Sequence, residues 1–190
     1  MVENMLKTAR NLDILVLFVH PNPQRSRVNK ALREAISDVS GINIHDLYEE
    51  YPDFFVDVEQ EQARLLEHDV IVFQHPLYWY SAPAILKEWQ VMVLEHGWAH
   101  GKNRTALHGK YWLQAVTMSG VPSSYSEEGH HGFSMEEFLR PFEATAKTCQ
   151  MLWLPPFLTY GTLASMDEGA IATRAVEYRE HLIAIRDGGL

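Results

Sequence analysis

The feature that most constrains the fold of this chain is a regular alternation of short apolar runs with longer amphipathic stretches. Residues 13–19 (DILVLFV) form a near-continuous apolar run rich in Ile and Val. This pattern is typical of a parallel strand that is covered on both faces. From Val28 to Val39 the apolar residues then recur at spacings of three and four, which predicts a helix with one apolar stripe that ends at Gly41.

The alternation continues to the end of the chain. Ser165 and Glu168 fit a capping box at the start of a last helix, and Gly188-Gly189 marks its end. Five strands and five helices in this order predict an α/β, flavodoxin-like fold, a five-stranded parallel sheet of order 2-1-3-4-5 with helices on both faces. Besides the first strand and first helix, we expect strands at residues 42–47, 70–74, 111–117 and 151–160, and helices at residues 58–67, 82–95, 135–150 and after Ser165.

Composition and charge narrow the class of protein. With 46% hydrophobic and 22% charged residues, the chain has the composition of a soluble globular protein. We interpret residues 1–12 as an N-terminal extension and residues 13–190 as a single domain. The net charge of −9 disfavours binding to nucleic acid or to anionic membranes. Residues 14–19 are too short a run to span a bilayer, and the first dozen residues lack the apolar core of a signal peptide, so we expect a cytoplasmic protein.

The cysteine and the histidines of the sequence indicate neither a nucleophile nor a metal site. Cys149 is the only cysteine, and it lies in a helical pattern where a buried core thiol is expected rather than a nucleophile. His96 and His100 are four residues apart and His108 follows. A glycine follows each of the first two, which argues against a rigid helical pair of ligands, and no carboxylate or cysteine cluster accompanies them. We therefore predict no metal site.

The predicted sheet indicates where a ligand should bind. In an open parallel sheet, ligands bind beyond the carboxyl ends of the strands, at the point where the strand order reverses. The loops that follow strands one, three and four are residues 20–29, 75–81 and 117–120. We expect these three loops to form one site.

The first of these loops predicts a phosphate site. It leads into a helix, so free N–H groups and the positive end of the helix dipole face the ligand, and Ser26 and Asn29 add side-chain donors. The loop contains no glycine and so matches neither G-x-G-x-x-G nor Walker A, which favours one phosphate monoester over a tightly wrapped diphosphate. The alternative is that Ser26 only caps the helix.

The other two loops predict a planar ring beside that phosphate. Residues 78–80 are aromatic and follow a buried strand, so they are expected to pack either on a flat heterocycle or against a neighbouring subunit. Residues 117–120 carry little side-chain bulk, so backbone N–H groups can approach the polar edge of a ring. One phosphate site and one aromatic shelf together predict flavin mononucleotide (FMN).

Four segments carry a resemblance to known proteins. They are YPDFFVDVEQEQ (51–62), VFQHPLYWYSAPAILKEW (72–89), HGWAHG (96–101) and WLPPF (153–157). The chain resembles the NAD(P)H quinone oxidoreductase family with a flavodoxin-like fold, and within it the ancillary proteins of glutathione-regulated bacterial potassium-efflux systems. The match covers nearly the whole chain, and the second segment also resembles mammalian quinone reductase.

The resemblance implies a flavin bound by the three loops. Family members typically read Thr-Thr-Gly-Gly at residues 117–120, so the side chains of Met118 and Ser119 put the close approach of this loop to the flavin in question. FAD, which the mammalian relatives use, is less expected because few residues follow the last strand. The implied cofactor-binding residues are His20, Ser26, Arg27, Val28, Asn29, Pro76, Leu77, Tyr78, Trp79, Tyr80, Thr117, Met118, Ser119 and Gly120.

Residues 125–132 (YSEEGHHG) resemble the quinone reductase segment whose Tyr and His hydrogen-bond the carbonyl edge of the flavin as it becomes anionic. Tyr125 and His131 match those positions and are the implied catalytic residues. Hydride arriving at the flavin pushes charge onto the far end of the ring, and a phenol beside an imidazole can donate to it. The alternative is that both are loop residues without this contact.

Together, the residues and the resemblance predict an FMN-dependent NAD(P)H:quinone oxidoreductase with ping-pong hydride transfer. NAD(P)H is the expected electron donor, and a quinone or related electrophile the acceptor. The resemblance also implies a homodimer and docking on the cytoplasmic face of a potassium/proton antiporter. Two alternatives remain: a regulatory binding subunit of the antiporter without catalysis, and a flavodoxin-type one-electron carrier.

Overall fold

A parallel β-sheet forms the centre of the molecule. The computed structural model describes residues 11–102, 106–163 and 166–190. The strand order is β2-β1-β3-β4-β5, with β6 also paired to β4, and every pairing is parallel. The predicted flavodoxin-like α/β fold and its strand order are confirmed. The strands are β1 (Ile14–Phe18), β2 (Ile42–Asp46), β3 (Val70–Pro76), β4 (Tyr111–Thr117), β5 (Leu152–Trp153) and β6 (Phe157–Thr159).

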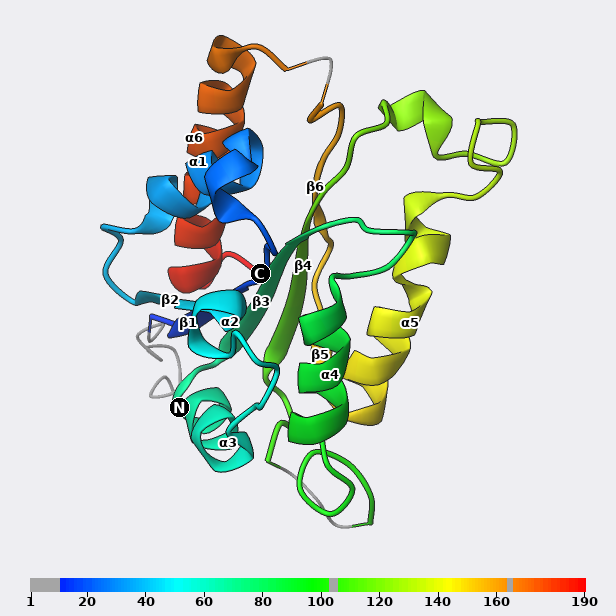
Figure 1. The fold of residues 1–190 in the computed structure, drawn as a ribbon. Helices are drawn as coiled ribbons and strands as arrows, with labels where there is room; N and C mark the ends of the chain where they lie inside the picture. The colour runs from blue at the N-terminus through cyan, green and yellow to red at the C-terminus, as the bar shows by residue number, and fades with distance from the viewer. Residues whose placement is uncertain (1–10, 103–105, 164–165) are drawn as a thin grey trace, which may run out of the picture.

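Helices cover both faces of this sheet. α1 and α6 lie together on one face, and α4 and α5 lie on the other (Figure 1). Two short 3-10 helices, η1 (Pro23–Arg25) and η2 (Pro122–Ser124), lie in the loops after β1 and β4. The α-helices are α1 (Arg27–Ile36), α2 (Leu47–Glu50), α3 (Val58–Glu67), α4 (Ala84–Val93), α5 (Met135–Thr148) and α6 (Glu168–Arg186).

The two-sided covering explains why the strands are apolar without a break. Alternate residues of a strand point to opposite faces. In β1, Leu15 and Leu17 pack toward α3, α4 and α5, whereas Ile14 and Val16 pack toward α1 and α6. All four side chains are at most 1% exposed, so the sequence shows a continuous apolar run instead of an alternating one.

The prediction of one continuous strand at residues 151–160 is wrong, because this segment forms two strands. The structure divides it into β5 and β6, which both pair with β4. Pro155 and Pro156 lie between the two strands. Proline has no N–H to donate to a strand ladder, so the pairing stops there and resumes at Phe157.

The last helix begins later than the capping pattern indicated. It starts at Glu168, and the side chain of Asp167 accepts a hydrogen bond of 2.8 Å from the backbone N–H of Ala170. The predicted cap, Ser165, lies outside the described residues. The helix ends before Gly188, whose φ of +87° is a left-handed conformation that glycine adopts readily.

Candidate functional site

A cavity of about 520 Å³ lies at the carboxyl edge of the sheet, where the loops after β1, β3, β4 and β6 meet. This volume falls within the roughly 300–1,000 Å³ that is usual for small-molecule sites. The three loops expected from the sequence do meet here. The lining consists of His20, Asn22, Arg25, Ser26, Arg27, Val28, Asn29, Pro76, Leu77, Tyr78, Thr117, Met118, Ser119, Thr162 and Leu163.

The amino end of α1 opens into this cavity. Ser26 occupies the N-cap position with an extended backbone, but its side chain makes no capping hydrogen bond, and the first turn holds no acidic residue. The first N–H groups of a helix have no intrahelical partner. The Ser26 hydroxyl and these N–H groups therefore remain available to an anion, while Ser26 does occupy the N-cap position of the alternative interpretation.

Three basic residues lie near this helix end, and they differ in the contacts that their side chains make. Arg25 is exposed and lines the cavity. Arg27 reaches across to α6, where its Nε lies 3.1 Å from Glu168 Oε1, so part of its charge is balanced by that carboxylate. Burial lowers the pKa of His20, whose Nδ1 accepts from the Asn22 backbone N–H at 3.0 Å. His20 is therefore neutral at physiological pH, and its Nε2–H is the remaining donor.

The floor of the cavity is formed by Asn29 and Thr117, both 2% exposed. Asn29 Nδ2 donates to Thr117 Oγ1 at 2.6 Å, which leaves the Thr117 hydroxyl hydrogen free to donate elsewhere. Asn29 Oδ1 has no hydrogen-bond partner among the described residues. A buried polar atom without a partner is unfavourable by about 1–3 kcal/mol, so the floor is suited to a polar ligand.

In the loop after β4, the Met118 side chain points into the core and not into the cavity. Met118 is 2% exposed and packs in the core on the α4 and α5 face, so its bulk does not fill the cavity. Its backbone N–H donates to the Thr159 carbonyl at 2.9 Å, and its carbonyl accepts from the Thr162 N–H at 3.1 Å. Both backbone groups are thus used within the protein, whereas Ser119 is exposed at the cavity wall.

The aromatic loop after β3 forms a tight turn. Tyr78 and Ser81 exchange two backbone hydrogen bonds of 3.0 Å, and the two residues between them have positive φ, 47° at Trp79 and 63° at Tyr80. Such a turn normally takes Asn or Gly, and the left-handed conformation costs other residues about 1–2 kcal/mol each. Tyr78 lines the cavity, but Trp79 is 92% exposed. The structure does not bring Trp79 or Tyr80 into the cavity.

Tyr80 belongs instead to an aromatic cluster with the two implied catalytic residues. The rings of Tyr125 and His131 stack with centroids 4.5 Å apart, and Tyr80 Oη lies 3.4 Å from His131 Nδ1. Burial raises the pKa of the Tyr125 phenol, so it stays protonated at neutral pH. A Cβ on Gly120 would lie 2.9 Å from the Tyr125 ring, so glycine is required for this close contact. The cluster therefore adjoins the loop after β4 but lies outside the cavity lining.

The cavity lining also contains residues that were not predicted from the sequence. Asn22 and Arg25 lie in the first loop but carry no motif of their own. Thr162 and Leu163 come from the loop after β6, and Leu163 is 82% exposed at the rim. The carboxyl end of β6 lies at the same edge of the sheet as those of β1, β3 and β4, so the position of this loop could have been inferred from strand direction.

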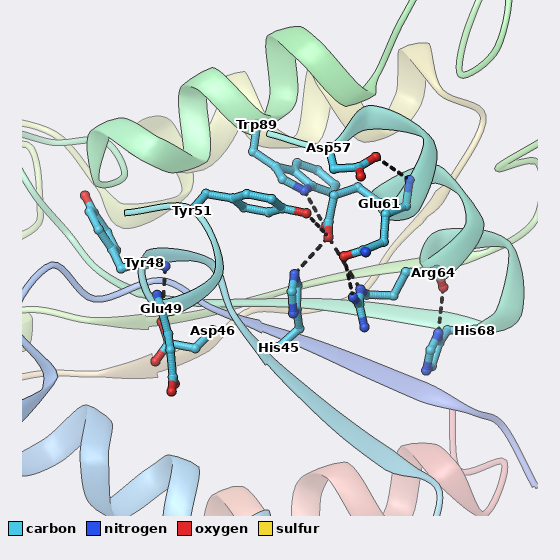
Figure 2. Close-up of polar contacts among 11 residues, drawn as sticks. His45, Asp46, Tyr48, Glu49, Tyr51, Asp57, Glu61, Arg64, His68 and Trp89 are labelled. Atoms are coloured by element: carbon cyan, nitrogen blue, oxygen red, sulfur yellow. Dashed lines mark hydrogen bonds and ion pairs between the residues drawn. The ribbon is translucent and has the colours of Figure 1, made fainter. Parts of the chain in front are cut away.

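A second buried polar cluster lies away from the cavity (Figure 2). Its centre is Glu61 of α3, which is fully buried. Glu61 accepts from Tyr51 Oη at 2.9 Å and from Trp89 Nε1 at 2.7 Å, and it lies 2.8 Å from His45 Nε2. Burial opposes ionisation, yet these contacts outweigh it, and the pKa of Glu61 lies below its ordinary value. No member of this cluster lines the cavity, so its contribution is to the packing of α3 and α4.

Two features of the described residues bear on metals and membranes. No three His, Cys, Asp or Glu side chains in these parts of the chain are placed to hold a metal ion. The His96 and His100 rings meet edge to face, with centroids 5.4 Å apart. In the same described ranges, no helix combines the length and the apolar character needed to cross a bilayer.

Comparison with known proteins agrees with this architecture. A family model described as a flavodoxin-like fold matches residues 13–182. The chain belongs to the flavodoxin-like family of NAD(P)H oxidoreductases. This membership covers the whole sheet and all of the loops that line the cavity.

Two relatives and one solved structure are similar to this chain over most of its length. The chain is 46% identical over 166 residues to the "uncharacterized NAD(P)H oxidoreductase YrkL" of Bacillus subtilis, covering 86% of this chain and 95% of that protein. It is 43% identical over 169 residues to the glutathione-regulated potassium-efflux system ancillary protein KefG of Pectobacterium carotovorum, with 89% and 92% covered. The crystal structure of general stress protein 14 from Treponema denticola in complex with FMN superimposes with a TM-score of 0.85 at 34% identity, covering 92% of this chain and 99% of that one.

Proposed function

We propose that this protein is an FMN-dependent NAD(P)H:quinone oxidoreductase that transfers two electrons in a ping-pong sequence. The observation that carries the proposal is the cavity at the carboxyl edge of the sheet. It combines an uncapped helix end beside Ser26 with an apolar and aromatic wall at Leu77 and Tyr78. One end suits a phosphate and the other suits a flat ring.

The donor set fits FMN better than FAD. The amino end of α1 and the free Ser26 hydroxyl provide donors for one phosphate group. The loop from residue 20 to residue 29 has no glycine, so its backbone does not wrap closely around a diphosphate. Asn29 Oδ1, which has no partner in the described part of the chain, and the hydrogen of the Thr117 hydroxyl offer an acceptor and a donor for the hydroxyl chain between phosphate and ring. The FMN complex of the Treponema relative supports the same choice.

When bound, the flavin supplies the redox chemistry, taking a hydride from NADH or NADPH and returning two electrons to a quinone or related electrophile. The protein's own part is to hold the ring edge and to donate a hydrogen bond to it. Tyr125 keeps its phenol proton because burial raises its pKa, and it can donate a hydrogen bond to charge that develops on the ring. His131, stacked on Tyr125 and close to Tyr80, holds that phenol in place.

The proposal includes a homodimer and a partner at the membrane. Similarity to KefG at 43% identity supports a role as ancillary subunit on the cytoplasmic face of a potassium/proton antiporter. The same similarity favours a second candidate function, a regulatory subunit that binds the antiporter without turnover. Trp79, 92% exposed on a strained turn, is available to a second protein chain in either case.

Steady-state kinetics of the FMN-loaded protein test the enzymatic function. With NADH or NADPH and a soluble quinone both varied, a ping-pong sequence gives parallel lines in double-reciprocal plots. Intersecting lines would contradict the ping-pong order. Absence of turnover, together with binding to the cytoplasmic domain of an antiporter, would instead favour the regulatory subunit.

A further inference from the structure

Four buried residues are linked by hydrogen bonds from α6 to the floor of the cavity, in part through the backbone of Asn29. Tyr178 Oη donates to Gln74 Oε1 at 3.2 Å, and Gln74 Nε2 donates to the backbone carbonyl of Asn29 at 3.0 Å. Asn29 Nδ2 then donates to Thr117 Oγ1 at 2.6 Å. Tyr178 and Gln74 are 0% exposed, and Asn29 and Thr117 are 2% exposed, so water does not replace any of these bonds.

The direction of each bond is fixed by its neighbours. A flipped Gln74 amide would place its oxygen against the Asn29 carbonyl, which is also an acceptor, so only the observed orientation satisfies both groups. Burial raises the pKa of Tyr178 far above its ordinary value, and its hydroxyl therefore remains a donor. The hydrogen bonds between these buried groups can therefore form in only one arrangement.

These hydrogen bonds connect the first turn of α1 to the two strands beside the cavity, β3 and β4. The Asn29 carbonyl belongs to the first turn of α1, and Gln74 on β3 holds that turn against the sheet. The Asn29 side chain bonds to Thr117 at the end of β4. The amino end of α1 is thus bonded to β4 directly through Asn29 and to β3 through Gln74, whose amide oxygen accepts from Tyr178.

We propose that Tyr178 and Gln74, which lie outside the cavity lining, are positioning residues for the phosphate of the bound cofactor and act through the first turn of α1. This inference rests on the proposed function. Without the Tyr178 hydroxyl, Gln74 Oε1 lacks a partner in an apolar core, and the amide is held only through its bond to the Asn29 carbonyl. The first turn of α1 then shifts relative to β3, and the phosphate loses part of its hydrogen-bonding geometry.

The test compares two substitutions that each remove one buried tyrosine hydroxyl. Tyr178→Phe removes the first donor of the chain, whereas Tyr51→Phe removes the donor to Glu61 on the opposite face of the sheet. Dissociation constants for FMN and for riboflavin, which lacks the phosphate, are measured by quenching of flavin fluorescence. We expect Tyr178→Phe to raise the FMN Kd about tenfold, the effect of one lost hydrogen bond, and to change the riboflavin Kd less than twofold.

The Tyr51→Phe control separates a specific effect on phosphate binding from a general loss of stability. Tyr51→Phe should lower the melting temperature while leaving both dissociation constants unchanged. Equal weakening of FMN and riboflavin by Tyr178→Phe, or equal weakening of FMN by both variants, would overturn the positioning role. If Tyr178→Phe does not fold, Gln74→Met removes the next donor and is expected to give the same selective loss of FMN. A wild-type protein that binds neither flavin would contradict the proposed function itself, and one that binds both equally would contradict only the phosphate positioning.

Discussion

At the scale of single residues, Ser26 offers the plainest test of the phosphate site. Its side chain makes no capping bond, so Ser26→Ala should leave the melting temperature unchanged. Loss of a hydrogen bond to a charged phosphate should raise the FMN Kd about tenfold or more. Isothermal titration with FMN gives the Kd. Ser37→Ala at the other end of α1, where the hydroxyl donates to the Glu34 carbonyl, is the matched control. A fall in stability with no change in FMN binding would return Ser26 to the role of a cap.

Tyr125 tests the catalytic part of the account. Tyr125→Phe keeps the ring stacked on His131 but removes the phenol donor. Because one donor to developing charge is worth about 10²–10³ in rate, we expect anaerobic reduction by NADPH to slow by roughly that factor while the FMN Kd stays the same. Stopped-flow absorbance measures the rate. Tyr160→Phe, which removes a phenol from the same group of rings, should react at the wild-type rate, and an equal loss in both variants would contradict a specific role for Tyr125.

At the scale of the element, α5 depends on a complete capping box. Ser134 Oγ accepts from the Glu137 N–H at 3.2 Å, and Glu137 Oε2 accepts from the Ser134 N–H at 2.8 Å. Ser134→Ala should lower the free energy of unfolding by about 1 kcal/mol, which corresponds to roughly 2–4 °C in the melting temperature. Calorimetry of this variant beside Ser123→Ala, an exposed serine of η2, checks the effect. Equal melting temperatures for the two variants would show that the box does not stabilise α5.

The strands and most of their order could be predicted from the sequence, whereas local turn geometry could not. The alternation of apolar runs and helical stripes predicted a parallel sheet, because burial on both faces gives each strand a continuous apolar run, and the number of strands favoured the order 2-1-3-4-5. The division between β5 and β6 was visible in Pro155-Pro156. The direction of Trp79 and Tyr80 was not, because their positive φ values depend on the turn that Tyr78 and Ser81 close. The three-loop site follows from strand direction, whereas the chain from Tyr178 to Thr117 joins segments far apart in the sequence.

At the scale of the whole molecule, the Glu61 cluster links stability to pH. The contacts from His45, Trp89 and Tyr51 hold the pKa of Glu61 below its ordinary value of 4.5. A carboxyl group with a lowered folded-state pKa stabilises the protein above its unfolded pKa, and this contribution is lost as the pH falls through the folded value. We expect the free energy of unfolding to decrease as the pH falls below about 4.5, with Glu61 as one source of the decrease.

Glu61→Gln isolates that source. At neutral pH the variant should lose about 3 kcal/mol, since a buried group is left with mismatched partners, and its stability should depend less steeply on acid pH than that of the wild type. Urea unfolding at a series of pH values measures both effects. Glu67→Gln, an exposed change on the same helix, should follow the wild-type curve. An unchanged acid dependence in Glu61→Gln would mean that other carboxyl groups account for it.

The most direct test of the whole account is the absorbance spectrum of the protein loaded with FMN, recorded without oxygen as NADH or NADPH and then a soluble quinone are added. We expect the flavin bands to bleach with the nucleotide and to return in full with the quinone. A protein that fails to bind FMN, or whose bound flavin stays oxidised in excess NADH and NADPH, would contradict this expectation.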